Sequence, residues 1–263
     1  MYPNKLLSVW LNCRARNFGD RHRTHKLTLH IRPGTLCLLT LVGTVLSGCD
    51  SGNQVTYRYR MTVEIETSKG IRTGSSVIQV ATSASKGALG SLLTTHVSGE
   101  AAAVDLPNGS TIYALLRSPS NENAAVNYAM AALLPVHPDK GGDARAWLNS
   151  LRALKNTEHS AELSRWGPAT GTGKQPASLW PVMATLGNAA DPKTVRIVPA
   201  HDLGSGAQVR RIVIAITDDP PTDNIRRRLP WLGDFPEPWL KGTGGFGQLP
   251  LSEKLKHGDF VRN

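Results

Sequence analysis

Residues 55–66, with the sequence VTYRYRMTVEIE, alternate strictly between two kinds of side chain. Apolar and aromatic residues stand at the odd positions, and charged residues or threonine stand at the even ones. Successive side chains of a β-strand point to opposite faces of its sheet, so this period of two predicts a long strand with one buried face. The chain must therefore build a sheet that has a second layer packed against one side.

The residues that follow predict an antiparallel meander, because strand patterns alternate with short turn signals. In chain order they predict a turn at 68–70, a strand at 71–80 with a candidate β-bulge at Gly74, a strand region at 92–106, a hairpin turn at Pro107-Asn108-Gly109 and a strand at 111–117. The first half of the folded region is thus expected to be all β.

Helical periodicity comes next, in residues 123–134 and 143–154, where apolar side chains recur every three to four positions. Further strands are predicted at 179–186, at 194–198 and at 209–217, the last as a buried strand. Strands, then helices, then strands again favour the α+β class over alternating βαβ units. We predict a single α+β domain over 55–232, with an antiparallel β meander, two central helices and C-terminal strands, and an irregular Pro/Gly-rich tail at 233–263.

An uncharged apolar run of 13 residues, 35–47, follows a basic flank. This length suits the apolar part of an export signal and is too short for a membrane-spanning helix, which needs about 20 residues. Leu46-Ser47-Gly48-Cys49 resembles the lipobox of bacterial lipoproteins. The resemblance implies cleavage between Gly48 and Cys49, acylation of Cys49 with palmitate-type chains, and attachment at the periplasmic face of a cell-envelope membrane.

This resemblance divides the N-terminal part into an extension with a signal peptide, residues 1–48, and a lipidated cysteine with a short tether, residues 49–54. Asp50 resembles the signal that retains enterobacterial lipoproteins in the inner membrane, so it slightly favours that membrane. The expected partners are the membrane, through the lipid, and an envelope protein of unknown identity.

Charge and cysteine content narrow the function classes. Seven of the 30 lysines and arginines and one of the 20 acidic residues precede Cys49, which leaves 23 against 19, a net charge of +4. So small an excess does not indicate a nucleic-acid partner. Because Cys13 and Cys37 also lie before Cys49, no disulfide or thiolate metal site is expected in the processed chain. We expect no cofactor and no metal site.

His137-Pro138-Asp139-Lys140 resembles the conserved loop of J-domain co-chaperones, and helical patterns flank it on both sides. A J domain also needs a preceding helix where this chain predicts a β meander, and residues 123–134 lack the basic face that meets Hsp70. A J-domain-like co-chaperone stays open as an alternative function.

The other motifs are weaker. A glycine-rich segment at 167–175 has the wrong spacing for a phosphate-binding loop, and the G-x-G-x-x-G pattern at 242–247 lacks a βαβ context. The aspartates at 218, 219 and 223 predict caps and turns more than a cation site. Arg226–Arg228 predict a solvated face that could meet lipid head groups or an acidic partner. No Gly-x-Ser-x-Gly motif occurs, so a hydrolase without a recognisable motif stays a second alternative.

The histidines outside the leader have no ligand spacing; they are His96, His137, His159, His201 and His257.

Four stretches, at 55–80, 99–117, 191–203 and 209–232, resemble a group of uncharacterised proteobacterial proteins, some of them prophage-associated. The resemblance implies that residues 55–232 form one unit, and it brings no catalytic residue. The sequence thus predicts a membrane-anchored lipoprotein whose domain is a non-enzymatic binding or interaction module.

Overall fold

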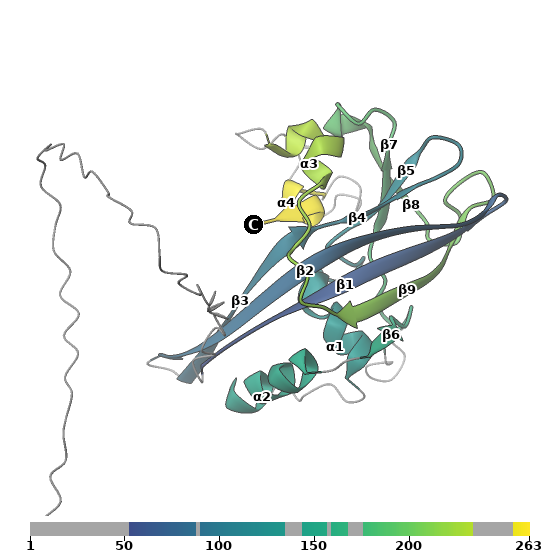
Figure 1. Ribbon diagram of the computed structural model, residues 1–263. Coiled ribbons are helices and arrows are strands. Elements are labelled where there is room, and N and C mark those ends of the chain that lie inside the picture. The colour runs from purple at the N-terminus through teal and green to yellow at the C-terminus, as the bar shows by residue number, and fades with distance from the viewer. Residues whose placement is uncertain (1–52, 88–89, 135–143, 157–158, 168–175, 234–254) are drawn as a thin grey trace, which may run out of the picture. The chain divides into compact units, whose positions relative to one another are not determined.

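The computed structural model describes residues 53–87, 90–134, 144–156, 159–167, 176–233 and 255–263, all within one compact unit (Figure 1). Its strands are β1 Gln54–Thr67, β2 Gly70–Gly87, β3 Gly90–Glu100, β4 Ala102–Asp105, β5 Thr111–Ala114, β6 Ser160–Glu162, β7 Met183–Leu186, β8 Val195–Val198, β9 Gln208–Ile216 and β10 Val261–Arg262. Its helices are α1 Tyr128–Leu133, α2 Ala144–Lys155, α3 Ile225–Arg228 and α4 His257–Phe260, with 3₁₀ turns η1 Ala124–Val126, η2 Pro192–Thr194 and η3 Pro230–Gly233. The predicted α+β class is confirmed.

The strands form two antiparallel sheets. The larger has the order β10-β3-β2-β1-β9-β6, and the smaller has the order β4-β5-β7-β8. β1 and β2 form a long hairpin whose register runs without interruption from Gln54 opposite Ser83 to Thr67 opposite Gly70. Figure 1 shows this hairpin spanning the domain, with α1 and α2 near one end and the smaller sheet near the other.

The inner face of the larger sheet carries the apolar residues of β1, as the alternation predicts. The odd positions from Val55 to Ile65 are 0–2% exposed. They pack into one cluster with Leu148, Leu151 and Leu154 of α2 and with apolar residues of β4, β5 and α1, which we call the first core. The Tyr57 and Tyr59 hydroxyls donate hydrogen bonds to the carbonyl oxygens of Val126 (3.3 Å) and Ala125 (2.6 Å), so these buried polar atoms are satisfied.

Gly74 does not form the expected β-bulge. It stands in register opposite Val63. Its backbone instead passes very close to β4: a Cβ at this position would overlap the Ala103 carbonyl oxygen and lie 2.9 Å from Cγ2 of Val104. Glycine is needed here because the smaller sheet crosses tightly over β2.

The strand region expected at 92–106 is divided between the two sheets. β3 pairs with β2 up to Ser98, and β4 then pairs with β5. Gly99 has a φ of +134° at the corner, a conformation that L side chains rarely adopt. The glycine that weakens the strand pattern therefore marks the change of sheet.

β9 was expected to be a buried strand, but only one of its faces is buried. Val209, Ile212 and Ile214 point inward, while Arg210 and Arg211 are exposed. The register against β1 shifts between Glu64 and Ile65, which places two arginines on the outer face beside one glutamate. Arg211 donates to both carboxylate oxygens of Glu64, each at 2.8 Å, so the charges on this strand are solvent-facing and paired.

The other face of the smaller sheet carries a second core, closed by α3, η3, α4 and β10, which we call the C-terminal cap. Phe260 is fully buried and lies edge-on to Tyr113 and Trp231, with ring centroids 6.1 Å and 5.5 Å away. The irregular tail expected at 233–263 thus ends in ordered structure, because these apolar residues cover a sheet face that water would otherwise reach.

Candidate functional site

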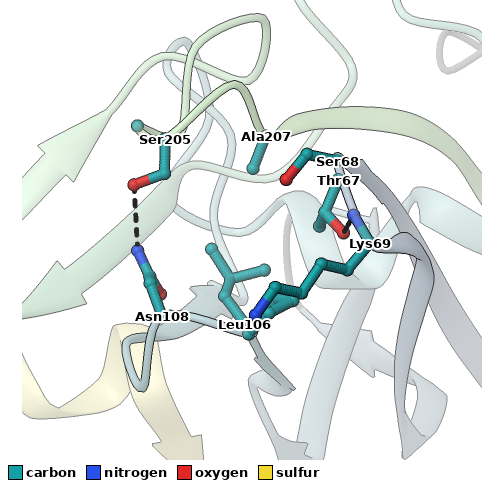
Figure 2. Close-up of a pocket in the computed structure, with 9 residues that line it drawn as sticks. Thr67, Ser68, Lys69, Leu106, Asn108, Ser205 and Ala207 are labelled. Atoms are coloured by element: carbon teal, nitrogen blue, oxygen red, sulfur yellow. Dashed lines mark hydrogen bonds between the residues drawn. The ribbon is translucent and has the colours of Figure 1, made fainter.

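The end of the larger sheet where β1 turns into β2 carries a pocket of about 130 Å³, called the loop pocket below (Figure 2). Three connections build it: the β1–β2 turn, the β4–β5 turn and the β8–β9 loop. Its lining residues are Thr67, Ser68, Lys69, Leu106, Pro107, Asn108, Gly204, Ser205 and Ala207.

Local hydrogen bonds hold the first two connections. The Thr67 hydroxyl donates to the Gly70 carbonyl oxygen (2.6 Å) and accepts from the Lys69 amide (3.2 Å), which closes the β1–β2 turn. In the next turn the Asn108 side chain accepts from the Ser110 amide at 3.0 Å. Gly70 and Gly109 have φ values of +99° and +85°, as tight turns of this kind require.

The β8–β9 loop has three consecutive residues with positive φ, Gly204 (+87°), Ser205 (+54°) and Gly206 (+71°). Ser205 is the non-glycine residue with positive φ among those that the structure describes. Its hydroxyl accepts a hydrogen bond of 3.3 Å from the Asn108 side-chain amide, which bridges two walls of the pocket (Figure 2). Backbone strain of this kind concentrates at binding sites, where the surroundings impose it.

The loop pocket combines an apolar floor with one cation. Leu106 and Ala207 are buried beneath it, and Figure 2 shows the Lys69 side chain extending toward Leu106. No described residue makes an ion pair with Lys69. The lining offers hydroxyl, amide and ammonium groups, from Thr67, Ser68, Asn108, Ser205 and Lys69.

A larger hollow of about 430 Å³ lies beside the start of α3. Glu100, which is 5% exposed, accepts hydrogen bonds from the amides of Asn224 and Ile225, both at 2.7 Å. Arg228 donates to both carboxylate oxygens of Asp105, at 2.7 Å and 3.0 Å. Because these charges attach α3 to β3 and β4, we assign them to holding the C-terminal cap.

Several predicted motif residues lie outside the described residues. These are Gly48 and Cys49, the His137–Lys140 loop, residues 168–175 and the glycines of 242–247. The helix before the His137 loop, α1, is six residues long and contains no basic side chain.

The remaining polar candidates are dispersed or paired. His96, His159 and His201 are exposed, and the His257 ring lies 2.7 Å from the Leu232 carbonyl oxygen. Within the part of the chain that the structure describes, no group of three or more histidines, cysteines or acids is arranged to hold a metal ion.

The acids near residue 220 and the arginine run are tied into the fold. Asp219 pairs with Arg60 and accepts from the Thr217 hydroxyl (2.7 Å), as a capping residue would. Asp223 pairs with Arg226 at 2.7 Å. Asn224 accepts from Arg227, and Arg228 holds Asp105. The run at 226–228 lies at the surface, as a solvated face would, and its guanidinium groups also make contacts within the domain.

The sequence alone did not identify Lys69, Asn108 and Ser205 as one site. It predicted the turns at 68–70 and 107–109 and the strands at 194–198 and 209–217 on either side of the third connection, but turn residues carry no signal of which connections meet. The Gly-Ser-Gly order at 204–206 is the one local hint, since flanking glycines favour positive φ.

No family model matches this chain, and neither a curated protein nor a solved structure matches it. Among the described helices, none combines the length and the apolar character needed to cross a membrane.

Proposed function

We propose that this chain is a bacterial lipoprotein, anchored through Cys49 at the periplasmic face of a cell-envelope membrane, and that its domain is a non-enzymatic binding module. Asp50 favours the inner membrane. The loop pocket is where the module takes a protein partner.

One observation carries this proposal: the loop pocket and the end of the tether lie at opposite ends of β1. Asn53 precedes the strand and Thr67 ends it. Fourteen residues at about 3.3 Å each give a separation of about 45 Å. An anchor at Cys49 would therefore hold one end of the domain near the bilayer and present the pocket to partners in the periplasm.

The chemistry of the pocket suggests what it takes. Small-molecule sites usually measure about 300–1,000 Å³, so a volume of about 130 Å³ suits a single side chain of a partner. The floor formed by Leu106 and Ala207 suits a short apolar stem, and Lys69 suits a carboxylate at its end. A glutamate side chain or a C-terminal carboxylate has this shape.

The anchor is tested by the mass of the protein purified from the membranes of a lipoprotein-producing bacterium. We expect the mass of residues 49–263 plus acyl chains, and we expect the Cys49→Ala variant to leave the membrane fraction. The mass of an unprocessed chain would overturn the anchor.

The pocket is tested by NMR of the detergent-solubilised protein labelled at the leucine and alanine methyl groups. Butyrate carries the proposed stem and carboxylate, and butyramide has the same stem without charge. We expect butyrate, and not butyramide, to shift the signals of Leu106 and Ala207.

The matched variants each remove one exposed lysine. Lys69→Met changes the pocket, and Lys86→Met changes the opposite end of the larger sheet. We expect only Lys69→Met to abolish the butyrate response. Equal responses in wild type and Lys69→Met, or no response in wild type, would overturn the pocket assignment.

A further inference from the structure

Two large apolar side chains are exposed at consecutive positions of β3. Leu92 is 62% exposed and Leu93 is 38% exposed. As neighbours in a strand they point to opposite faces of the sheet, so both faces of the β2–β3 hairpin carry a leucine near its end. Contact of these two side chains with water is unfavourable, because apolar surface gains free energy on leaving water.

The hairpin lies at the end of the sheet from which the tether starts. The Ala84 amide donates to the Asn53 carbonyl oxygen at 2.8 Å, and Leu93 stands opposite Ala84 in the register of β2 with β3. Adjacent strands are about 4.8 Å apart, so Leu93 is roughly two strand spacings from the start of β1.

The hairpin also extends past the start of β1. Leu92 stands opposite Ser85, and the pairing continues to Gly87 opposite Gly90. Three residues beyond Ala84 add about 10 Å at the rise of a β-strand. The tether between Cys49 and Asn53 spans at most about 14 Å, so the hairpin projects over most of the distance that the tether can cover.

The charge of this segment suits a bilayer surface. Residues 81–99 contain no aspartate or glutamate, and Lys86 is exposed near the end of the hairpin. Lysine near a bilayer is attracted to anionic lipid head groups. Leucine side chains gain free energy on leaving water for the acyl boundary of the membrane interface.

We propose that the end of the β2–β3 hairpin docks into the membrane interface through Leu92 and Leu93, with Lys86 against anionic head groups. This inference rests on the proposed anchor at Cys49. The lipid anchor and the hairpin then hold the domain at two points. Two attachment points fix the orientation of β1 relative to the bilayer.

The test uses the full chain with Cys13→Ser and Cys37→Ser, produced in bacterial membranes and reconstituted into phosphatidylethanolamine–phosphatidylglycerol vesicles. A thiol-reactive, environment-sensitive fluorophore is attached at Leu92→Cys, or at Ser68→Cys in the exposed β1–β2 turn as the matched control. Nitroxide-labelled lipids report contact with the bilayer, and the mass of the same sample reports the state of Cys49.

We expect severalfold stronger quenching at position 92 than at position 68, together with a blue shift at 92 alone. Equal quenching at the two positions with an acylated Cys49 would overturn the docking and leave the anchor standing. A blue shift at 92 without quenching would mean that a second copy of the protein covers the leucines, which also overturns it. A mass that shows fluorophore attached to Cys49 would mean that this cysteine is not acylated, which overturns the anchor and the docking that rests on it.

Discussion

The two cores of this domain are built in different ways. The first core follows from β1, whose apolar residues lie on one face because they alternate along a single strand. The second core, beneath the C-terminal cap, joins Ala101 and Tyr113 to Trp231, Phe260 and Val261, which are far away in the sequence. The pattern behind the first core can be recognised in a short stretch of sequence. The second core forms only when the C-terminal residues pack against the smaller sheet.

The buried polar groups of the two cores have different partners. In the first core, the hydroxyls of Tyr57 and Tyr59 donate to backbone carbonyl oxygens. Beside the cap, Arg117 lies 3.3 Å from the carboxylate of Asp259, and both side chains are 4% exposed. Burial disfavours the charged forms of both side chains, so this pair contributes little net stability. The cap thus places a charged pair in a buried position, although it follows from no local pattern.

Phe260→Ala tests whether the cap is a necessary part of the domain, and it has the largest expected effect. The residue is fully buried between two aromatic rings. Such truncations cost about 3–5 kcal/mol in free energy of unfolding. Urea unfolding of the full chain measures the loss, with Leu92→Ala as an exposed control expected to change stability by less than about 0.5 kcal/mol. A loss below about 1 kcal/mol for Phe260→Ala would mean that the second core is dispensable.

Gly74→Ala tests the contact between the two sheets, and its expected effect is intermediate. The added methyl group meets the backbone of Ala103, which cannot move without shifting β4. Overpacking of this kind costs about 1–3 kcal/mol. Gly258→Ala in α4 is the matched control, since nothing lies within 4 Å of the added atom and alanine favours a helix. Thermal unfolding should separate the two variants, and a stable Gly74→Ala protein would contradict the close crossing.

The same contrast explains which parts of the fold were predictable. Period-two alternation predicted β1, and helical spacing predicted α2 with Leu148, Leu151 and Leu154 buried. The hairpin turn at 107–109 followed from its residue types. All of these depend on neighbours in the sequence.

The parts that were not predicted depend on distant contacts. The reason for glycine at position 74 is a close contact with Ala103, which is 29 positions away in the sequence. The local pattern, which suggested a β-bulge, could not reveal that contact. The alternation of buried and exposed side chains along β9 is interrupted, because its register against β1 shifts beside Glu64. The loop pocket joins three separate turns, so Lys69 and Ser205 gave no sign of sharing a site.

The smallest expected effect is a difference in pH dependence between two aspartates, one in the cap and one in β4. Burial raises the pKa of Asp259 above its usual range, although the Lys256 amide and Arg117 act in the opposite direction. A hydrogen bond from Arg228 instead holds the pKa of Asp105 below its usual range. An aspartate whose pKa is raised by folding stabilises the domain most at pH values below its pKa in the unfolded chain, about 3.9. This contribution is lost as the pH rises through the pKa of the folded state. A lowered pKa gives stability that is present above that value and is lost in acid.

Asp259→Asn and Asp105→Asn should therefore diverge when urea unfolding is measured from pH 3 to pH 7. Relative to wild type, the stability of Asp259→Asn should improve as the pH rises through the window above about pH 4. That of Asp105→Asn should worsen as the pH rises toward about pH 4, because wild type then regains the ion pair with Arg228. The Asp105 effect is expected to be at most about 1 kcal/mol and to shrink with added salt, since both partners are exposed. Differences of the same sign in both variants would mean that Asp259 is held as a charged partner of Arg117, and the cap would then be fixed by attraction rather than by burial.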